Sequence, residues 1–213
     1  MRDMPQDFAR RLKEAVSARP PQRVHVEGAR RAAVLIPIVG TERPQLLFTV
    51  RTDTLPSHRG QISFPGGSID PADPTPAGAA LREAQEEIGL DASAVQMIGE
   101  VDSIATFVSG YVIHPFVGLL ERLPHLAPNP AEVAEVLLVP LDEVNETTRR
   151  EPGFVHAGQT YPTEAWVWRG HVIWGATARV LRLLLRRLAE AGLAEDPGED
   201  PPWGRAAGRS GKS

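Results

Sequence analysis

Apolar residues gather in short runs along most of the chain, and turn-forming residues separate these runs. Residues 32–39 (AAVLIPIV) and 45–50 (QLLFTV) are predicted to be strands that the turn GTERP joins. A third short strand, 61–64 (QISF), leads into the breaker-rich segment PGGSIDPADPTPAG. Further strands are predicted at 95–101, 111–120, 135–139, 165–168 and 171–174.

Helical spacing replaces the strand pattern near both ends of the chain. Residues 5–16 place Phe8, Leu12 and Val16 four positions apart, which predicts a short amphipathic helix. Residues 175–191 carry a longer apolar stripe, which predicts a packing helix. The loop 17–31 between the first helix and the first strand is expected to lie over the domain.

A third helix is predicted at residues 76–88, between the two groups of strands. Thr75 can cap its start, and Pro76 suits the first helical position because its missing N–H costs little there. Gly89 follows the last residue, where a left-handed cap is usual. This order of elements predicts a mixed α/β (α+β) fold in which helices flank a sheet.

Three regions are expected along the chain. Residues 1–29 form an N-terminal helix and arm, residues 30–194 form one domain, and the Pro/Gly-rich residues 195–213 form a disordered tail. A length of 213 residues suits one domain of ordinary size with appended ends.

The composition mainly excludes classes of function. A net charge of −4 argues against a broad nucleic-acid surface. The lack of cysteine excludes disulfides, thiolate metal sites and a cysteine nucleophile. The N-terminus has no apolar signal segment, and no apolar run approaches the roughly 18 residues that span a bilayer. We therefore expect a cytoplasmic protein that does not enter a membrane.

The central helix carries three glutamates in the stretch LREAQEEIGL (residues 81–90). Helix geometry places an apolar stripe on one face and Glu83, Glu86 and Glu87 on another. Side chains three and four positions apart are close enough for one cation to bridge, and Mg²⁺ prefers carboxylate oxygens. From the helix alone, a solvated acidic face is the stronger alternative. The preceding diglycine, Gly66 and Gly67, favours a site, because glycines expose backbone N–H groups.

The whole stretch resembles the signature of the Nudix hydrolase family, G-x5-E-x7-R-E-U-x-E-E-x-G-U with U apolar. The matching residues are Gly67, Arg82, Glu83, Ala84, Glu86, Glu87, Gly89 and Leu90. The chain departs from the signature in the loop, where Asp73 replaces the first glutamate and the interval to Arg82 is one residue longer.

Residues 46–70 resemble an additional signature of the coenzyme A pyrophosphatase subgroup of that family. The matching residues are Leu46, Leu47, Thr49, Arg51, Leu55, His58, Gly60, Phe64, Pro65, Gly66, Gly67 and Asp70. Pro56 stands where the subgroup has an arginine. Residues 129–144 and 173–185 resemble closing segments of the same family.

The resemblance implies a Nudix fold, with a mixed sheet between helices, and metal-dependent hydrolysis of coenzyme A to 3′,5′-ADP and 4′-phosphopantetheine. It implies that Glu83 and Glu87 hold Mg²⁺ or Mn²⁺, with Glu86 as a third ligand. Glu86, Arg82 and Glu132 are the predicted catalytic residues: Arg82 pairs with a neighbouring glutamate, and Glu132 is a candidate base or else a metal ligand or loop cap. The predicted substrate-binding residues are Arg51, His58, Arg59, Gly66 and Gly67.

Other functions stay open at this point. The same chemistry on ADP-ribose or a dinucleotide is the nearest alternative, and residues 46–70 argue against it. A module that only binds a nucleotide disagrees with the intact glutamates, and an enzyme directed at nucleic acid disagrees with the acidic charge balance. The expected partner is a small nucleotide substrate, with no nucleic acid and no membrane. The oligomeric state is left open, a monomer being one expectation.

Overall fold

The protein is described by a computed structural model that covers residues 6–53, 60–106, 109–144, 148–156 and 159–198. The helices in this part of the chain are α1 (Gln6–Ser17), α2 (Pro76–Ile88), α3 (Gly175–Glu190) and the short 3-10 helix η1 (Ala92–Ala94). The strands are β1 (Arg30–Val39), β2 (Gln45–Arg51), β3 (Ile62–Ser63), β4 (Gly66–Ser68), β5 (Gln96–Glu100), β6 (Ile104–Ala105), β7 (Tyr111–Leu120), β8 (Val133–Pro140), β9 (Thr148–His156), β10 (Gln159–Trp168) and β11 (His171–Trp174).

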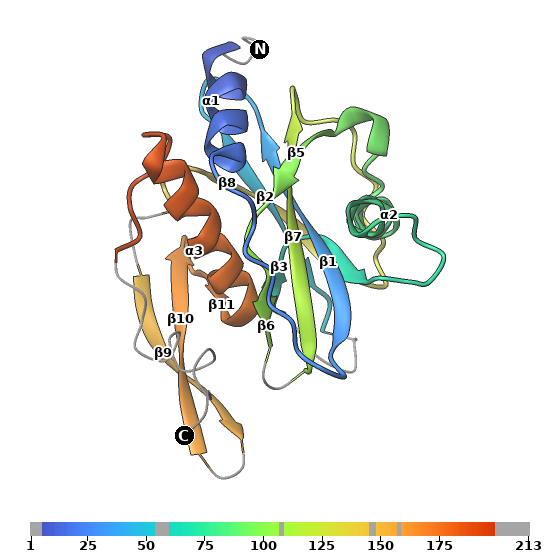
Figure 1. Cartoon of the computed structure of the whole chain (residues 1–213), viewed down its shortest axis with the longest axis vertical. Helices are drawn as coiled ribbons and strands as arrows, with labels where there is room; N and C mark the ends of the chain where they lie inside the picture. Colours follow the sequence, from blue (N-terminus) through green and yellow to red (C-terminus); the bar gives the residue numbers. More distant parts are fainter. Residues whose placement is uncertain (1–5, 54–59, 107–108, 145–147, 157–158, 199–213) are drawn as a thin grey trace.

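The main sheet lies between helices on both of its faces (Figure 1). Its central order is β3-β2-β1-β7-β5, while β4 pairs with β1, β6 with β7 and β8 with β2. β1 and β7 run parallel, whereas β2 pairs antiparallel with both β1 and β8, so the sheet is mixed. α1 and α3 cover one face, and α2 covers the other. The predicted arrangement of helices flanking a sheet is confirmed.

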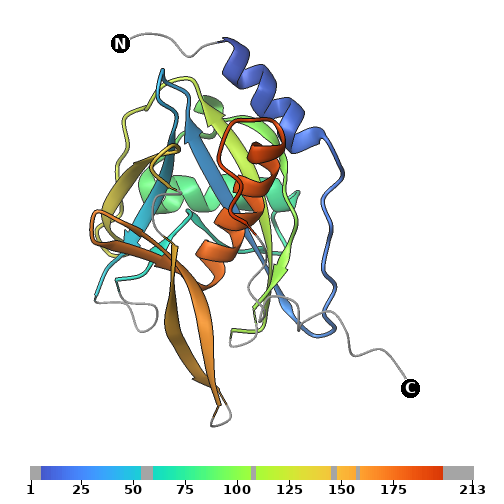
Figure 2. The same ribbon diagram turned by 90° about the vertical axis from the view of Figure 1, so that its left-hand side faces the viewer.

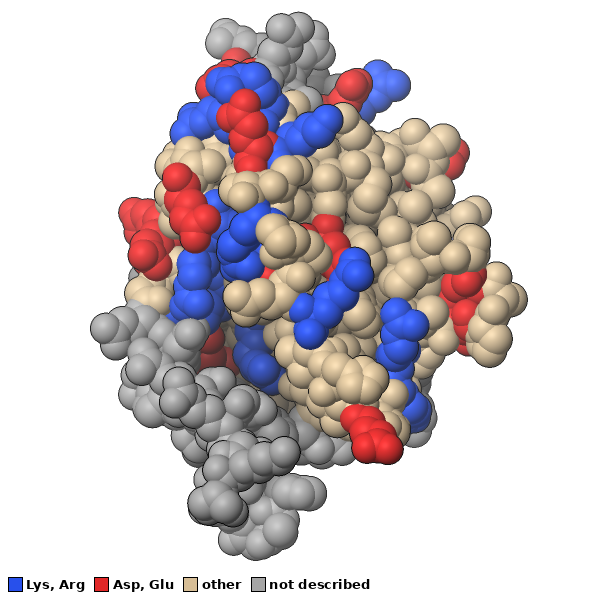
Figure 3. All heavy atoms as spheres, viewed as in Figure 1, with Lys and Arg blue, Asp and Glu red and all other residues tan. Residues whose placement is uncertain are grey.

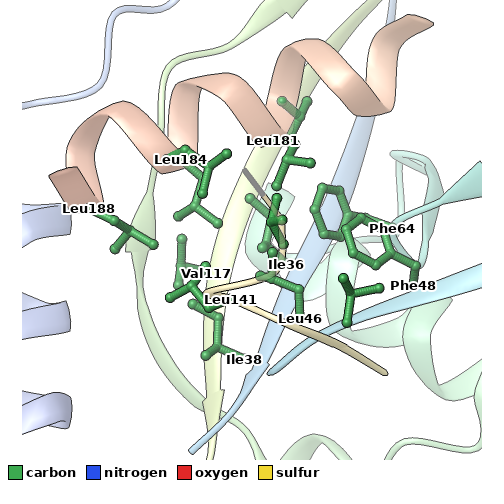
Figure 4. Packing of buried hydrophobic residues seen from close by; sticks show 14 of the residues in the cluster. Ile36, Ile38, Leu46, Phe48, Phe64, Val117, Leu141, Leu181, Leu184 and Leu188 are labelled. Atoms are coloured by element: carbon green, nitrogen blue, oxygen red, sulfur yellow. The ribbon is translucent and has the colours of Figure 1, made fainter. Parts of the chain in front are cut away.

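The two faces of β1 are both buried, which explains its nearly continuous apolar sequence. Ile36 and Ile38 point toward the leucines of α3 (Figure 4). Ala33 and Leu35 belong to the second apolar cluster, which α2 covers. One strand therefore fixes the position of α2 relative to the rest of the core.

Some strands lie outside the predicted apolar runs. β4 falls in the breaker-rich segment, where the sequence predicts no strand, because backbone atoms alone make its pairing with β1. β9 has a polar sequence, TRREPGFVH, and pairs with β10 in a separate three-stranded sheet. The hairpin of β9 and β10 projects from the body of the molecule (Figures 1 and 2).

The arm between α1 and β1 follows the main body, as the sequence predicts (Figure 2). The backbone N–H of Ser103 donates to the carbonyl of Gln22 at 3.0 Å, and the N–H of Val24 donates to the hydroxyl of Ser103 at 2.7 Å. None of the helices in the described part of the chain combines the length and the apolar composition that a membrane span requires.

A buried arginine joins the arm to α3. Arg187 is 1% exposed and donates to the carbonyls of Val16 and Arg19 at 2.7 and 2.9 Å and to the Asp102 carboxylate at 2.7 Å. The substitution Arg187→Met removes the donor to both carbonyls and one ion pair of Asp102, which keeps its bonds from Arg19 and the Gln22 N–H. We therefore expect the free energy of unfolding to fall by about 3 kcal/mol. Urea denaturation measures this loss, and a change below about 0.5 kcal/mol, typical of surface sites, would contradict it.

Candidate active site

The caps of α2 are those predicted from the sequence. The Thr75 hydroxyl accepts the N–H of Gly78 at 3.0 Å. Gly89 has a φ of 66°, and its N–H donates to the Gln85 carbonyl at 2.9 Å. The helix therefore begins at Pro76 and ends at Ile88, as predicted. Its apolar side packs on the sheet, so the opposite side is free to carry chemistry.

The diglycine of β4 lies directly against two of the three glutamates. The N–H of Gly66 donates to Glu87 Oε2 at 3.3 Å. A Cβ atom on Gly67 would lie 2.6 Å from the carboxylate carbon of Glu83. Gly66 itself has a φ of 155° and lies against the backbone of β1, where a Cβ would come 2.4 Å from the carbonyl oxygen of Ala33. Both glycines are therefore required for the close approach of β4 to these carboxylates.

The carboxylate of Glu87 is held in a desolvated position. Glu87 is 4% exposed, and burial raises its pKa from 4.5 to about 7. Arg51, with Nη1 at 3.9 Å from Oε1, opposes this rise without cancelling it. Burial also raises the pKa of Glu83, and the nearby charge of Glu132 raises the pKa of both carboxyls. Three carboxylates thus repel one another around the diglycine.

Arg82 connects the helix to the loop before it. It bonds Asp73 at 3.0 Å, Glu83 at 3.0 Å and Glu86 at 3.1 Å, so the predicted pairing with a neighbouring glutamate is present. Arg82 also holds the pKa of the Asp73 carboxyl below its ordinary value. Asp73 therefore serves as the loop partner of Arg82, while Asp70 is farther from the guanidinium, at 3.8 Å.

The other predicted site residues lie at the ends of β2 and β8 or outside the described residues. Arg51 ends β2 beside Glu87, and its buried Nε has no hydrogen-bond partner among the described residues. Glu132 immediately precedes β8, and its carbonyl accepts the N–H of Thr52 at 3.0 Å. Its carboxylate accepts a hydrogen bond from Asn129, a residue that the sequence placed only in a loop. His58 and Arg59 lie outside the described residues.

A divalent cation fits this donor set as far as the described residues go. In that part of the chain no group of three or more Asp, Glu or His side chains is arranged to hold a metal ion. Glu86 is turned to Arg82 and its side chain is 57% exposed. However, Mg²⁺ is typically bound by one or two carboxylates together with waters and substrate phosphates. The desolvated pair Glu83 and Glu87 is compatible with this mode of binding, and both the pair and the three-glutamate set stay predictions.

The raised pKa of Glu87 predicts how stability depends on pH when no metal is added. Because the folded protein binds this proton more tightly than the unfolded chain, the free energy of unfolding should fall as the pH rises from 4.5 to about 7. The shift corresponds to roughly 3 kcal/mol.

The matched variant Glu87→Gln should lose this part of the pH dependence, because glutamine does not titrate. Urea denaturation of both proteins at pH 5 and pH 7.5, with a chelator present, measures the difference. Identical pH dependence in the two proteins would remove Glu87 from this role.

Comparisons with known proteins point to one family. The sequence profile of the NUDIX domain matches residues 29–159. An uncharacterized Nudix hydrolase, NudL, from Photorhabdus laumondii is 38% identical over 170 residues, which cover 79% of this chain and 90% of the relative. A protein of the same name from Cronobacter sakazakii is 39% identical over 163 residues, covering 76% of this chain and 84% of the relative.

The fold has a counterpart among solved structures. A MutT/nudix family protein from Enterococcus faecalis superimposes with a TM-score of 0.55 over 85% of this chain and 74% of that chain, at 11% identity. The chain belongs to the Nudix family of hydrolases, which act on nucleoside diphosphate derivatives. The predicted Nudix fold, an α+β arrangement with a mixed sheet between helices, is confirmed.

Proposed function

We propose that this Nudix hydrolase cleaves the pyrophosphate bond of coenzyme A and its derivatives, giving 3′,5′-ADP and 4′-phosphopantetheine. The observation that carries the proposal is the position of Arg51. This residue belongs to the additional subgroup signature, and it meets the Nudix helix at Glu87. Its buried Nε has no hydrogen-bond partner within the part of the chain that the structure describes, and guanidinium groups suit bidentate contacts with phosphate.

The chemistry assigns a role to each side chain at the site. Glu83 and Glu87 would hold Mg²⁺ or Mn²⁺, which when bound would neutralise phosphate charge and acidify water. Arg82 fixes the loop at Asp73. Arg51 donates to a phosphate oxygen of the substrate.

Glu132 accepts the proton of the attacking water. The water oxygen forms a bond to one phosphorus, and the bridging P–O bond breaks. Its electron pair leaves with the other phosphate. The burial of Glu87 favours cation binding, because its negative charge is poorly solvated and a bound cation would stabilise it.

The charged surface supports a small substrate rather than nucleic acid. Figure 3 shows Lys and Arg interspersed with Asp and Glu on the face viewed. Several arginines are paired, such as Arg10 with Glu14 at 2.7 Å, Arg23 with Glu100 at 2.6 Å and Arg43 with Asp142 at 2.8 Å. Paired charges offer little to a phosphate backbone, whose binding depends on several available cations.

The proposal is tested by a substrate panel. Purified protein is incubated with coenzyme A, an acyl-coenzyme A, ADP-ribose and NADH, each with Mg²⁺ or Mn²⁺, and the products are separated. We expect the highest kcat/KM for coenzyme A or its acyl form, with 3′,5′-ADP released in both cases. Cleavage of ADP-ribose with coenzyme A left intact would contradict the subgroup assignment while keeping the family chemistry.

A further inference from the structure

Asn129 lies where the end of α2 meets the loop that carries Glu132. Its N–H donates to the carbonyl of Glu87 at 2.8 Å, and the N–H of Ala127 donates to the carbonyl of Ile88 at 2.8 Å. Both carbonyls belong to the last turn of α2, which has no helical donors for them. The loop is therefore fastened to the same turn that holds a predicted metal ligand.

The fit at this junction is close. A Cβ atom on Gly89 would lie 2.9 Å from the Cβ of Ala127 and 3.0 Å from its backbone nitrogen. Gly89 thus ends the helix and also admits the loop. The distance between the loop and α2 has little freedom to change.

The side chain of Asn129 continues from this anchor to Glu132. Its Oδ1 accepts the N–H of Ala131 at 3.1 Å, and its Nδ2 donates to Oε1 of Glu132 at 3.2 Å. A backbone N–H can only donate, so the contact with Ala131 requires the amide oxygen on that side. The amide NH₂ then necessarily faces the carboxylate.

Backbone pairing places Glu132 beside the predicted metal ligands, because the next residue, Val133, pairs with Arg51, whose Nη1 lies 3.9 Å from Oε1 of Glu87. The charge of Glu132 acts on both Glu83 and Glu87. The backbone of Glu132 is fixed as well, because its N–H donates to the Asn129 carbonyl at 3.0 Å and its carbonyl accepts from Thr52 at 3.0 Å. With the backbone held, the amide of Asn129 is the hydrogen-bond donor to the Glu132 carboxylate within the described residues, and it orients that side chain.

We propose that Asn129 is a positioning residue, which holds the carboxylate of Glu132 toward Glu83 and Glu87 in register with α2. The inference rests on the proposed function, in which Glu132 accepts the proton of the attacking water. Asn129 itself touches neither the reacting water nor the phosphates. A residue that only formed the turn would need the oxygen of the amide but not its NH₂ group.

Two substitutions separate these roles. Asn129→Ser keeps an oxygen that can accept the N–H of Ala131, as serine does in turns of this kind, and removes the donor to Glu132. Asn129→Asp keeps the acceptor and places a negative charge beside the Glu132 carboxylate. Each is made in the wild-type protein and in the Glu132→Gln variant. Thr52→Val serves as the control, because it removes the 3.1 Å bond from Thr52 to the Ala131 carbonyl, which belongs to the same turn.

We expect Asn129→Ser to lower kcat about tenfold and Asn129→Asp to lower it further, with KM within about twofold of wild type. In the Glu132→Gln background both should change kcat by less than about twofold, because the positioned group is already gone. The control should lower the melting temperature and leave kcat within about twofold of wild type.

Equal losses of kcat in the two backgrounds, or none in either, would overturn the inference. So would an unchanged kcat in Glu132→Gln alone. The assay uses coenzyme A or ADP-ribose, whichever the wild type hydrolyses. The wild-type substrate therefore tests the proposed function, whereas the ratio between backgrounds tests Asn129.

Discussion

Glu87→Gln should lower kcat by about 10²–10³-fold, the size of effect seen when one preorganised electrostatic group is lost from an active site. The carboxylate is 4% exposed beside the diglycine, and glutamine is nearly the same size and cannot bind a cation as an anion does. The fold should survive, because burial already opposes the charge of Glu87. Steady-state kinetics with Mg²⁺ and circular dichroism measure the two effects.

The stability of Glu87→Gln should change in the opposite direction to its activity. Without metal at pH 7.5, Glu87→Gln should be more stable than wild type, since it removes a desolvated negative charge. Loss of activity with a gain of stability is typical of a functional residue. Glu135→Gln is the matched control, because Glu135 is exposed on β8 and the same change there should affect neither property. Wild-type turnover by Glu87→Gln would exclude the carboxylate from the mechanism.

Gly67→Ala should reduce kcat about 100-fold, because a misplacement near 1 Å at an active site has effects of this size. The added methyl group would lie 2.6 Å from the carboxylate carbon and Oε2 of Glu83, and the carboxylate must move away. The φ of Gly67 lies outside the left-handed region, so alanine is permitted by the backbone. The free energy of unfolding should therefore change by less than about 1 kcal/mol.

The neighbouring glycine supplies the comparison. In Gly66→Ala the methyl group would lie 2.4 Å from the Ala33 carbonyl oxygen and 2.6 Å from the Cα of Val34, and neither backbone atom can move freely. We expect a loss of about 3 kcal/mol or more in the free energy of unfolding. Kinetics and urea denaturation on both variants test the contrast. If Gly67→Ala retains full activity, the diglycine does not set the position of Glu83.

The central helix was the part of the fold most completely predictable from sequence. Its bounds depend on local chemistry: Thr75 at the start, Pro76 in the first turn and Gly89 at the end. The direction of the glutamates follows from the same periodicity. Local signals of this kind act within a few residues, so the sequence displays them directly.

The surroundings of the helix could not be predicted in the same way. The pairing of Gly66 with Val34 and the approach of Arg51 to Glu87 join residues far apart in the chain. The role of Asp73, in the loop before α2, was equally hidden in the sequence. Its bond to Arg82 forms only because the chain turns between the two residues. Asn129 gave one local signal, the turn-forming Asn-Pro pair, but its contact with Glu87 depends on the docked loop.

The region after β8 shows where hydrophobic periodicity fails. β9 is polar, and β10 begins at Gln159 rather than near residue 165, because each strand is held by pairing with its neighbour. Backbone pairing of this kind does not require an alternation of apolar and polar residues, so hydrophobic periodicity alone does not predict such strands.

A divalent-cation site formed by Glu83 and Glu87 is the basis of the proposed catalysis. Calorimetric titration of Mn²⁺ into wild type, Glu83→Gln, Glu87→Gln and the control Glu135→Gln at pH 7.5 measures this. We predict that the affinity for Mn²⁺ falls more than about tenfold in the first two variants and is unchanged in the control. Equal Mn²⁺ affinity in all four proteins would contradict the account.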